Sequence, residues 1–248
     1  MTRKNLDEFF NKNPQRYWSS KTEKNVNLFN HSEYYLPESL VEFIVEMLAG
    51  NSYEKCLDPW AQNGILLSSL VYSEIVKKGF GICINEHEFT SAQKIGENLE
   101  IQWEHADPWR WIKNYNETYD LIISNLPWEM KTRKTILEEQ EFKDIHDNNE
   151  LLFLMKVCHL LKPEGIGIFI VPKKFINLDK TNSVYANLGR FGFALDSYLA
   201  LPGLTFSPST SMSGGIAVIR KSVPIPIFTG LVQNDAEQRK KLIENFQK

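Results

Sequence analysis

The stretch Ser124-Asn125-Leu126-Pro127-Trp128 brings together residue types that suit the binding of a planar amine. Asn125 offers a side-chain carbonyl oxygen and Leu126 a backbone carbonyl oxygen, and both accept hydrogen bonds. Pro127 has a fixed φ, and Trp128 presents a flat apolar face on which a ring can stack. Two acceptors on the hydrogens of an exocyclic amino group help to localise the nitrogen lone pair. The stretch therefore suits attack of such a nitrogen on an electrophilic methyl group.

The apolar run directly before this stretch, residues 119–123, predicts a buried parallel strand. The strand would open into a rigid turn, because the residue before a proline is biased towards extended backbone. The carboxyl ends of parallel strands are where open α/β sheets bind their ligands. The alternative is that Asn-Leu-Pro merely ends a strand, and these residues alone do not decide between the two.

A second ligand-binding signal precedes this strand in the chain. Residues 55–59 predict a short strand that ends on Asp58, and a turn containing Gly64 leads into a helical run over residues 65–77. A strand, a tight turn with glycine and a helix form the first βα unit of a nucleotide-binding sheet. Because the turn has one glycine, the pyrophosphate fingerprint of dinucleotide sites is missing. A smaller cofactor with an amino-acid end, held by Asp58 and the backbone near Gly64, fits better.

The next two predicted strands are also followed by acids. Glu86 follows a strand over residues 80–84, where an acid can bind the ribose hydroxyls; a solvated acid at a helix amino terminus is the alternative. Asp107 follows a strand over residues 101–106 and can accept from an adenine amino group, while Pro108 or Trp109 covers the ring. An ordinary helix cap is the alternative for Asp107.

Composition limits the class of protein. The chain has 248 residues, 42% hydrophobic and 24% charged, as in ordinary globular proteins. Its net charge of -3 argues against unaided nucleic-acid binding, so a nucleic-acid substrate would need a local basic patch or a partner. The cysteines lie far apart within apolar runs, which predicts reduced thiols, no metal site and a cytoplasmic protein. No apolar run approaches membrane-spanning length.

The chain divides into a polar amino-terminal extension (1–30), a body (31–221) and a carboxyl-terminal segment with an amphipathic helix (222–248). In the body, five strands of the βα type precede a closing pair. The connection between that last pair, residues 202–211, has no helical pattern, so the pair should be antiparallel. We therefore predict an α/β fold with a seven-stranded, mostly parallel sheet whose last strand is antiparallel.

From about residue 31 to 221 the chain resembles adenine-specific amino-methyltransferases that use S-adenosylmethionine, and most of all the modification subunit of type I restriction systems. Tyr34-Tyr35-Leu36-Pro37 is similar to the aromatic-Thr-Pro motif of that family, and Asp58-Pro59-Trp60-Ala61-Gln62-Asn63-Gly64 to its Asp-Pro-x-x-Gly-x-Gly loop. Asn125-Leu126-Pro127-Trp128 resembles its Asn-Pro-Pro-aromatic motif, although the turn itself is closer to that of rRNA adenine dimethyltransferases. Residues 201–221 are similar to the closing segment of the type I group.

This resemblance implies the Rossmann-like class I methyltransferase fold, S-adenosylmethionine as cofactor and adenine in DNA as acceptor. The catalytic residues it implies are Asn125, Leu126, Pro127 and Trp128. The cofactor-binding residues it implies are Tyr35, Pro37, Asp58, Trp60, Gly64, Glu86, Asp107, Pro108 and Asn125. The helical amino-terminal domain and the target-recognition module of such subunits are not recognisable, so we expect DNA specificity to come from a separate specificity subunit or another partner.

Two departures from the family pattern matter, and one assignment stays open. Gln62 replaces the first loop glycine and, if that site needs a positive φ, costs on the order of 1 kcal/mol or more besides crowding the cofactor. Leu126 replaces a proline, and Cys83 lies where a Gly-x-acid frame from Gly81 would place the ribose acid instead of Glu86. Three alternatives therefore stay open: transfer to an rRNA adenine, transfer to a protein glutamine, or an inactive methyltransferase-like scaffold.

Overall fold

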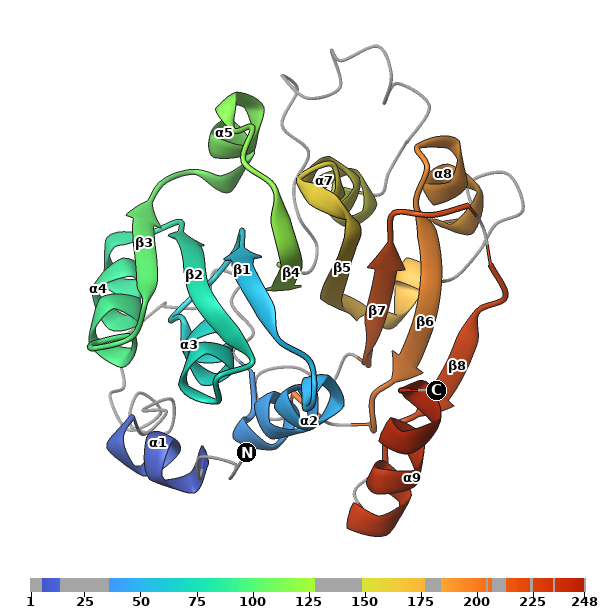
Figure 1. Ribbon diagram of the computed structural model, residues 1–248, viewed down its shortest axis with the longest axis horizontal. Coiled ribbons are helices and arrows are strands. Elements are labelled where there is room, and N and C mark those ends of the chain that lie inside the picture. Colours follow the sequence, from blue (N-terminus) through green and yellow to red (C-terminus); the bar gives the residue numbers. More distant parts are fainter. Residues whose placement is uncertain are drawn as a thin grey trace, which may run out of the picture.

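Figure 1 shows a computed structural model of the chain in which a single sheet lies between two layers of helices. The structure describes residues 6–13, 36–127, 149–176, 184–203, 205–206, 213–223, 225–233 and 235–247. The strands are β1 (Tyr53–Asp58), β2 (Val76–Cys83), β3 (Ile101–His105), β4 (Tyr119–Asn125), β5 (Leu161–Pro172), β6 (Ala194–Ala200), β7 (Gly214–Arg220) and β8 (Phe228–Leu231). The α-helices are α1 (Leu6–Lys12), α2 (Glu38–Leu48), α3 (Ile65–Tyr72), α4 (Glu86–Ile95), α5 (Pro108–Trp111), α7 (Asn149–Cys158), α8 (Val184–Arg190) and α9 (Ala236–Phe246). Short 3-10 helices, η2 (Ile112–Asn114) and η4 (Lys173–Ile176), follow α5 and β5.

The strands lie in the order β3-β2-β1-β4-β5-β7-β6-β8. The first five are mutually parallel, and β7 runs antiparallel to both of its neighbours. The chain passes from β1 outwards to β2 and β3 and then returns to β4 on the other side of β1. In open α/β sheets a ligand crevice forms where the strand order reverses in this way. The carboxyl ends of β1 and β4 are therefore the expected position of a site.

The predicted α/β fold with a mostly parallel sheet is confirmed, but the predicted number of seven strands is wrong, because the sheet has eight. The additional strand, β8, pairs in parallel with β6 at the edge of the sheet. It has four residues and comes two residues after Pro226, so its sequence gives a weak strand signal. Proline is tolerated next to edge strands, where one side of the backbone needs no partner. The reversed strand is β7, and the last strand of the chain is parallel to β6.

Both faces of the sheet are covered by apolar side chains. Along β4, Ile122 packs with α7 and α8 on one face, whereas Ile123 packs with α2 and α3 on the other. Alternate residues of a strand point to opposite faces, so this continuous apolar run is what a strand buried on both faces requires. In Figure 1, α5, α7 and α8 lie above the sheet, and α1, α2 and α9 lie below it.

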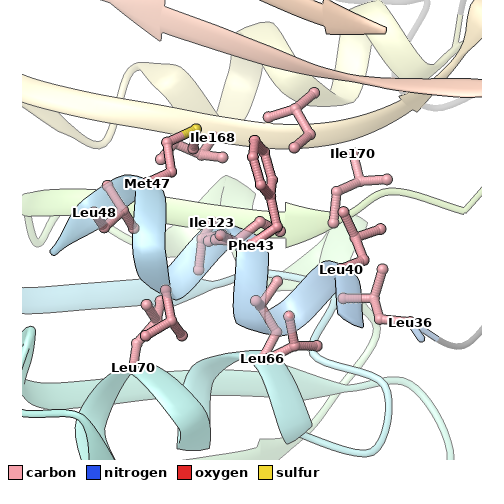
Figure 2. Packing of buried hydrophobic residues seen from close by; sticks show 14 of the residues in the cluster. Leu36, Leu40, Phe43, Met47, Leu48, Leu66, Leu70, Ile123, Ile168 and Ile170 are labelled. Atoms are coloured by element: carbon pink, nitrogen blue, oxygen red, sulfur yellow. The ribbon is translucent and has the colours of Figure 1, made fainter. Parts of the chain in front are cut away.

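Figure 2 shows how α2 packs onto the central strands. Phe43 and Met47 of α2 point towards β4 and β5, where Ile123 and Ile168 lie, and Leu66 of α3 approaches α2. Phe43 is 2% exposed and Met47 is fully buried. Full burial of such a side chain stabilises a protein by about 1.5–3 kcal/mol. This packing holds the central strands against α2 and α3 and so fixes where their carboxyl ends lie.

The helix predicted over residues 65–77 is shorter in the structure. It ends at Tyr72, Glu74 takes a left-handed conformation with φ 59°, and β2 begins at Val76. Val76 is 1% exposed, so its burial in the sheet overrides the helical pattern that continues through Lys77.

The carboxyl-terminal segment packs onto the body. The amphipathic helix predicted near residues 236–246 is confirmed as α9. At its end, Gln247 Nε2 donates to the carbonyl oxygens of Met47 and Ala49 at 3.2 and 3.1 Å. The segment thus contributes both a strand of the sheet and a helix beside α2. No helix within the described residues has the length and apolar character that crossing a lipid bilayer requires.

Candidate active site at the carboxyl edge of the sheet

Asp58 lies at the carboxyl end of β1, beside β4. Its Oδ1 accepts a hydrogen bond from the hydroxyl of Ser124 at 2.9 Å and one from the backbone N–H of Trp60 at 3.1 Å. The residue is 2% exposed. Burial raises the pKa of Asp58 to about 7, although the hydrogen bonds from Ser124 and Trp60 oppose this shift. The carboxyl group is therefore poised to ionise near neutral pH, and a cation bound beside it would favour its charged form.

The connection from β1 to α3 is a tight loop held by backbone hydrogen bonds. Ala61 N–H donates to the carbonyl of Ile82 at 2.8 Å, and Gly64 N–H donates to the carbonyl of Ala61 at 2.7 Å. Gly64 has φ 79°, and a Cβ at this position would lie 2.6 Å from Trp103 Cη2. Glycine is thus required here both by its backbone conformation and by the close approach of Trp103.

Gln62 lies in the same loop with φ 50°, so the left-handed backbone considered from the sequence is confirmed. A residue with a Cβ pays on the order of 1 kcal/mol or more for this conformation. The Gln62 carbonyl accepts from Cys83 Sγ at 3.3 Å, and the residue is 4% exposed. Burial raises the pKa of the Cys83 thiol, which keeps it protonated as the donor of this contact.

The end of β4 carries the predicted amine-binding stretch. Asn125 is 3% exposed, and its Nδ2 donates to Gln62 Oε1 at 3.2 Å. The backbone N–H of Leu126 donates to the carbonyl of Ile170 on β5 at 3.3 Å, and Pro127 is buried. Because β5 fixes the turn through this N–H, the backbone of Leu126 has a defined orientation. Trp128 lies outside the described residues.

The structure therefore brings Asp58 and Asn125 together. The two are linked through Ser124, which precedes Asn125 and bonds to Asp58, and through Gln62 in the loop after Asp58. The sequence indicated neither the Ser124 hydroxyl contact nor the bond between Gln62 and Asn125. The contact between Ser124 and Asp58 could be predicted from the sequence, because a hydroxyl and an acid stand at the ends of two adjacent parallel strands.

The ends of β2 and β3 form a more open part of this edge. Glu86 is the first residue of α4, its side chain is 85% exposed, and its Oε2 lies 3.7 Å from His105 Nδ1. Cys83, by contrast, is the last residue of β2 and is fully buried beside the loop. The acid thus lies outside the strand, where it can reach solvent and a ligand at the edge.

Asp107 caps α5: its Oδ1 accepts from the backbone N–H of Trp109 at 3.0 Å, as the capping alternative had it. Pro108 occupies the first turn of that helix and is buried. Trp109 is 3% exposed and packs edge-on against Phe153 at 4.7 Å, so it belongs to the core and does not cover a ligand ring. The cap uses one carboxylate oxygen of Asp107 for this bond, and a carboxylate has acceptor capacity on both oxygens.

The remaining predicted residues lie around this edge. Trp60 follows Asp58 and packs edge-on against Phe153 at 5.5 Å. Pro37 is the residue before α2 and has an extended backbone with φ -61° and ψ 143°, whereas Tyr35 lies outside the described residues. No group of three or more His, Cys, Asp or Glu side chains suited to a metal ion occurs among the residues that the structure describes.

The comparison with protein families decides which group this geometry belongs to. The family described as N-6 DNA Methylase matches residues 21–226, which is most of the chain. The chain belongs to this family. No curated protein matches the sequence closely enough to count as a relative.

Solved structures share the fold of this N-6 DNA methylase chain. A type I restriction-modification methyltransferase subunit from Streptococcus thermophilus has a TM-score of 0.70 at 16% identity, over 87% of this chain and 53% of that one. A modification subunit assigned to a type I restriction enzyme from Vibrio vulnificus has a TM-score of 0.71 at 16% identity, over 89% and 54%. An S-adenosylmethionine-dependent methyltransferase from Geobacter sulfurreducens, in complex with S-adenosylhomocysteine, has a TM-score of 0.51 at 10% identity, over 74% and 91%.

These likenesses establish the class I methyltransferase fold that the sequence predicted. The chain spans about half the length of the two type I subunits that it matches.

Proposed function

We propose that the chain transfers the methyl group of S-adenosylmethionine to the exocyclic amino group of adenine in DNA. The observation that carries this proposal is the joining of Asp58 and Asn125 at the ends of β1 and β4. The Asp58 carboxylate suits the amino-acid end of a methyl donor, and the Asn125 amide oxygen suits the amino group of an acceptor. Membership of the N-6 DNA methylase family supports the same reaction.

The residues at the sheet edge fit a donor of this chemistry. A carboxylate at Asp58, buried beside a loop with two left-handed residues, suits a bound ammonium group. Glu86 would bind the ribose hydroxyls and Asp107 with Pro108 the adenine ring, while Tyr35, Pro37, Trp60 and Gly64 complete the proposed binding set. The bound cofactor would supply an electrophilic methyl group on a sulfonium.

The acceptor would be held by the turn after β4. The target adenine has to leave the helical stack, which costs a few kcal/mol. Asn125 and the Leu126 carbonyl would then orient its amino group, Pro127 would keep the turn rigid, and Trp128 would stack on the ring. Asn125 and Leu126 are 3% and 1% exposed, and this burial supports a role in a site from which water is largely excluded. Orientation and fixed dipoles of this kind lower a barrier without a covalent intermediate.

DNA binding would depend on a partner. The net charge of -3 gives no general attraction to phosphates, so a separate specificity subunit or another DNA-binding protein would supply the contacts. Residues 31–221 would form the catalytic unit, with 222–248 packed onto it. A cytoplasmic location belongs to the same proposal and is supported by Cys56, Cys83 and Cys158, which are buried as free thiols.

An acceptor panel tests the proposal. The chain would be incubated at low ionic strength with radiolabelled S-adenosylmethionine and, separately, high concentrations of adenine-containing DNA, rRNA and a glutamine-containing peptide, so that binding of the acceptor does not require the partner. We expect label in DNA as N6-methyladenine, and we expect Asn125→Ala to lower the transfer rate by about a hundredfold or more without weakening donor binding. Asn187→Ala, which removes a buried asparagine of α8, is the matched control. Equal transfer by wild type and Asn125→Ala, or label confined to RNA or peptide, would refute the proposed reaction.

A further inference from the structure

The side chain of Gln62 connects the two sides of the proposed donor site. One side is the loop after β1, which carries Gln62, and the other is the end of β4, which carries Asn125. The 3.2 Å bond from Asn125 Nδ2 to Gln62 Oε1 spans the space between them. Both residues are almost fully buried, at 4% and 3% exposure. The bond therefore lies in the interior of the site and not on its rim.

The loop backbone is fixed on the side away from Asn125. The Gln62 carbonyl accepts from Cys83 Sγ at 3.3 Å, and Ala61 N–H donates to the Ile82 carbonyl at 2.8 Å. These contacts tie the loop to β2, so the backbone of Gln62 has little freedom to retreat. Its side chain has three rotatable bonds and is the part that can move.

The positions of Asp58 and Asn125 define where a donor must lie. Its amino-acid end would pair with Asp58, and its methyl group would face the amino nitrogen held by Asn125. Asp58 and Asn125 lie close together, because the hydroxyl of Ser124, the residue before Asn125, donates to Asp58 at 2.9 Å. A donor that reaches both groups would lie beside the loop, where the Gln62 amide bonds to Asn125.

From this geometry we propose that Gln62 closes the donor site of the free protein, and that the donor binds when the Gln62 side chain turns away and releases Asn125. The inference rests on the proposed function, since it concerns access to the same site. Closure lowers the apparent affinity by the fraction of molecules in the open form. The hydrogen bond is made by Asn125 Nδ2, whereas the adenine amino group would donate to Asn125 Oδ1, so the closure concerns access of the donor and not of the acceptor.

Donor titrations of matched variants test the closure. Isothermal calorimetry with S-adenosylmethionine would compare wild type, Gln62→Ala and Gln62→Gly. Gln62→Ala removes the closing side chain but keeps a Cβ at φ 50°, and Gln62→Gly also removes the backbone strain. We expect both variants to bind the donor about tenfold more tightly than wild type, because one net hydrogen bond corresponds to roughly that factor. Asn98→Gly relieves a left-handed residue with φ 64° outside the site and should leave donor affinity unchanged.

Kinetics give a second readout. If Gln62 acts by closing the site, Gln62→Ala should lower the KM for S-adenosylmethionine about tenfold and leave kcat within about twofold of wild type. A residue needed for transfer itself would instead lower kcat on substitution. S-adenosylhomocysteine, which lacks the methyl group, should show the same gain in affinity and thus report closure without turnover.

The outcomes separate this inference from the proposed function. Equal donor affinity in wild type and Gln62→Ala would overturn the closure while leaving the methyltransferase proposal intact. Tighter binding by Gln62→Gly alone would assign the effect to backbone strain and would also overturn the closure. If neither wild type nor the two Gln62 variants bound S-adenosylmethionine at millimolar concentration, S-adenosylmethionine would be excluded as a ligand, and the proposed function would be refuted.

Discussion

The raised pKa of Asp58 predicts how the stability of the protein depends on pH, without any ligand. Burial raises its pKa from the ordinary value of 3.8 to about 7 in the folded chain. Because the folded value lies above the unfolded one, its contribution to stability is complete below pH 3.8 and is lost as the pH rises through about 7. Asn in its place keeps an oxygen that accepts from Ser124 and Trp60 but does not ionise.

Asp58→Asn should therefore gain stability relative to wild type as the pH rises. Between pH 5 and pH 8 we expect the free energy of unfolding of the variant, minus that of wild type, to increase by roughly 2 kcal/mol. Urea unfolding at the two pH values measures this difference, and all other groups cancel because they titrate in both proteins. A difference that is constant with pH would show that Asp58 does not titrate in this range.

The same ionisation should control binding of the donor. If the Asp58 carboxylate pairs with an ammonium group, affinity follows the ionised fraction and falls by about a hundredfold from pH 8 to pH 5. Asp58→Asn should bind more weakly at pH 8 and should lose most of this pH dependence. Calorimetric titration with S-adenosylmethionine at pH 8, 6.5 and 5 measures the profile, and identical profiles for both proteins would exclude Asp58 from donor binding.

At the scale of an element, the loop between β1 and α3 depends on Gly64. The residue has φ 79°, and an added Cβ would meet Trp103 at 2.6 Å and Ala92 Cβ at 2.9 Å. Gly64→Ala should lower the free energy of unfolding by about 2–4 kcal/mol, from backbone strain and overpacking together. Gly192 has φ 76° but nothing within 4 Å of an added Cβ, so Gly192→Ala measures the strain alone.

The comparison of these two alanine variants isolates the approach of Trp103 to the loop. We expect Gly192→Ala to lose only about 1 kcal/mol. Chemical denaturation gives both values. If the two variants were equally destabilised, Trp103 would not constrain the loop, and its position under Gly64 would have no energetic consequence.

The elements show which parts of the structure are accessible from sequence. β4 and β5 have long apolar runs, whereas β1 is short. The strand ends at Asp58 and Asn125 can be recognised from sequence because strand ends in a parallel sheet share one edge. β8 is not predictable from its sequence, because a four-residue strand close to Pro226 has little periodicity. The end of α3 predicted from the sequence is wrong, because the helical pattern continues into residues that belong to β2.

The site was predictable only in part for a related reason. A sequence places Asp58 and Asn125 at one edge, but the direction of a side chain within a loop depends on backbone conformation. Gln62 reaches Asn125 because φ 50° and the bond from Cys83 orient the loop. Neither the φ angle of Gln62 nor the bond from Cys83 can be predicted from the pattern of residue types. For Trp109 the pattern suggested a ligand face, whereas packing on Phe153 places it in the core.

At the scale of the whole molecule, the sheet has two distinct halves. The half from β3 to β5 has the proposed site residues at its carboxyl edge. Asp58 and Asn125 are the last residues of β1 and β4, and Glu86 and Asp107 follow β2 and β3. The half from β7 to β8 closes the sheet and, through α9 and Gln247, reaches back to the end of α2. The chemistry proposed here thus occupies the parallel half, and the antiparallel β7 completes the core behind it.

The most direct test of the account is to locate the bound donor on the chain. Radiolabelled S-adenosylmethionine would be crosslinked to the wild-type protein by ultraviolet light at pH 8, and the labelled peptides mapped by mass spectrometry. We predict label on peptides containing Asp58–Gly64 or Ser124–Trp128, removed by excess unlabelled donor. Label confined to other peptides, or label that excess donor does not remove, would contradict a donor site between β1 and Asn125.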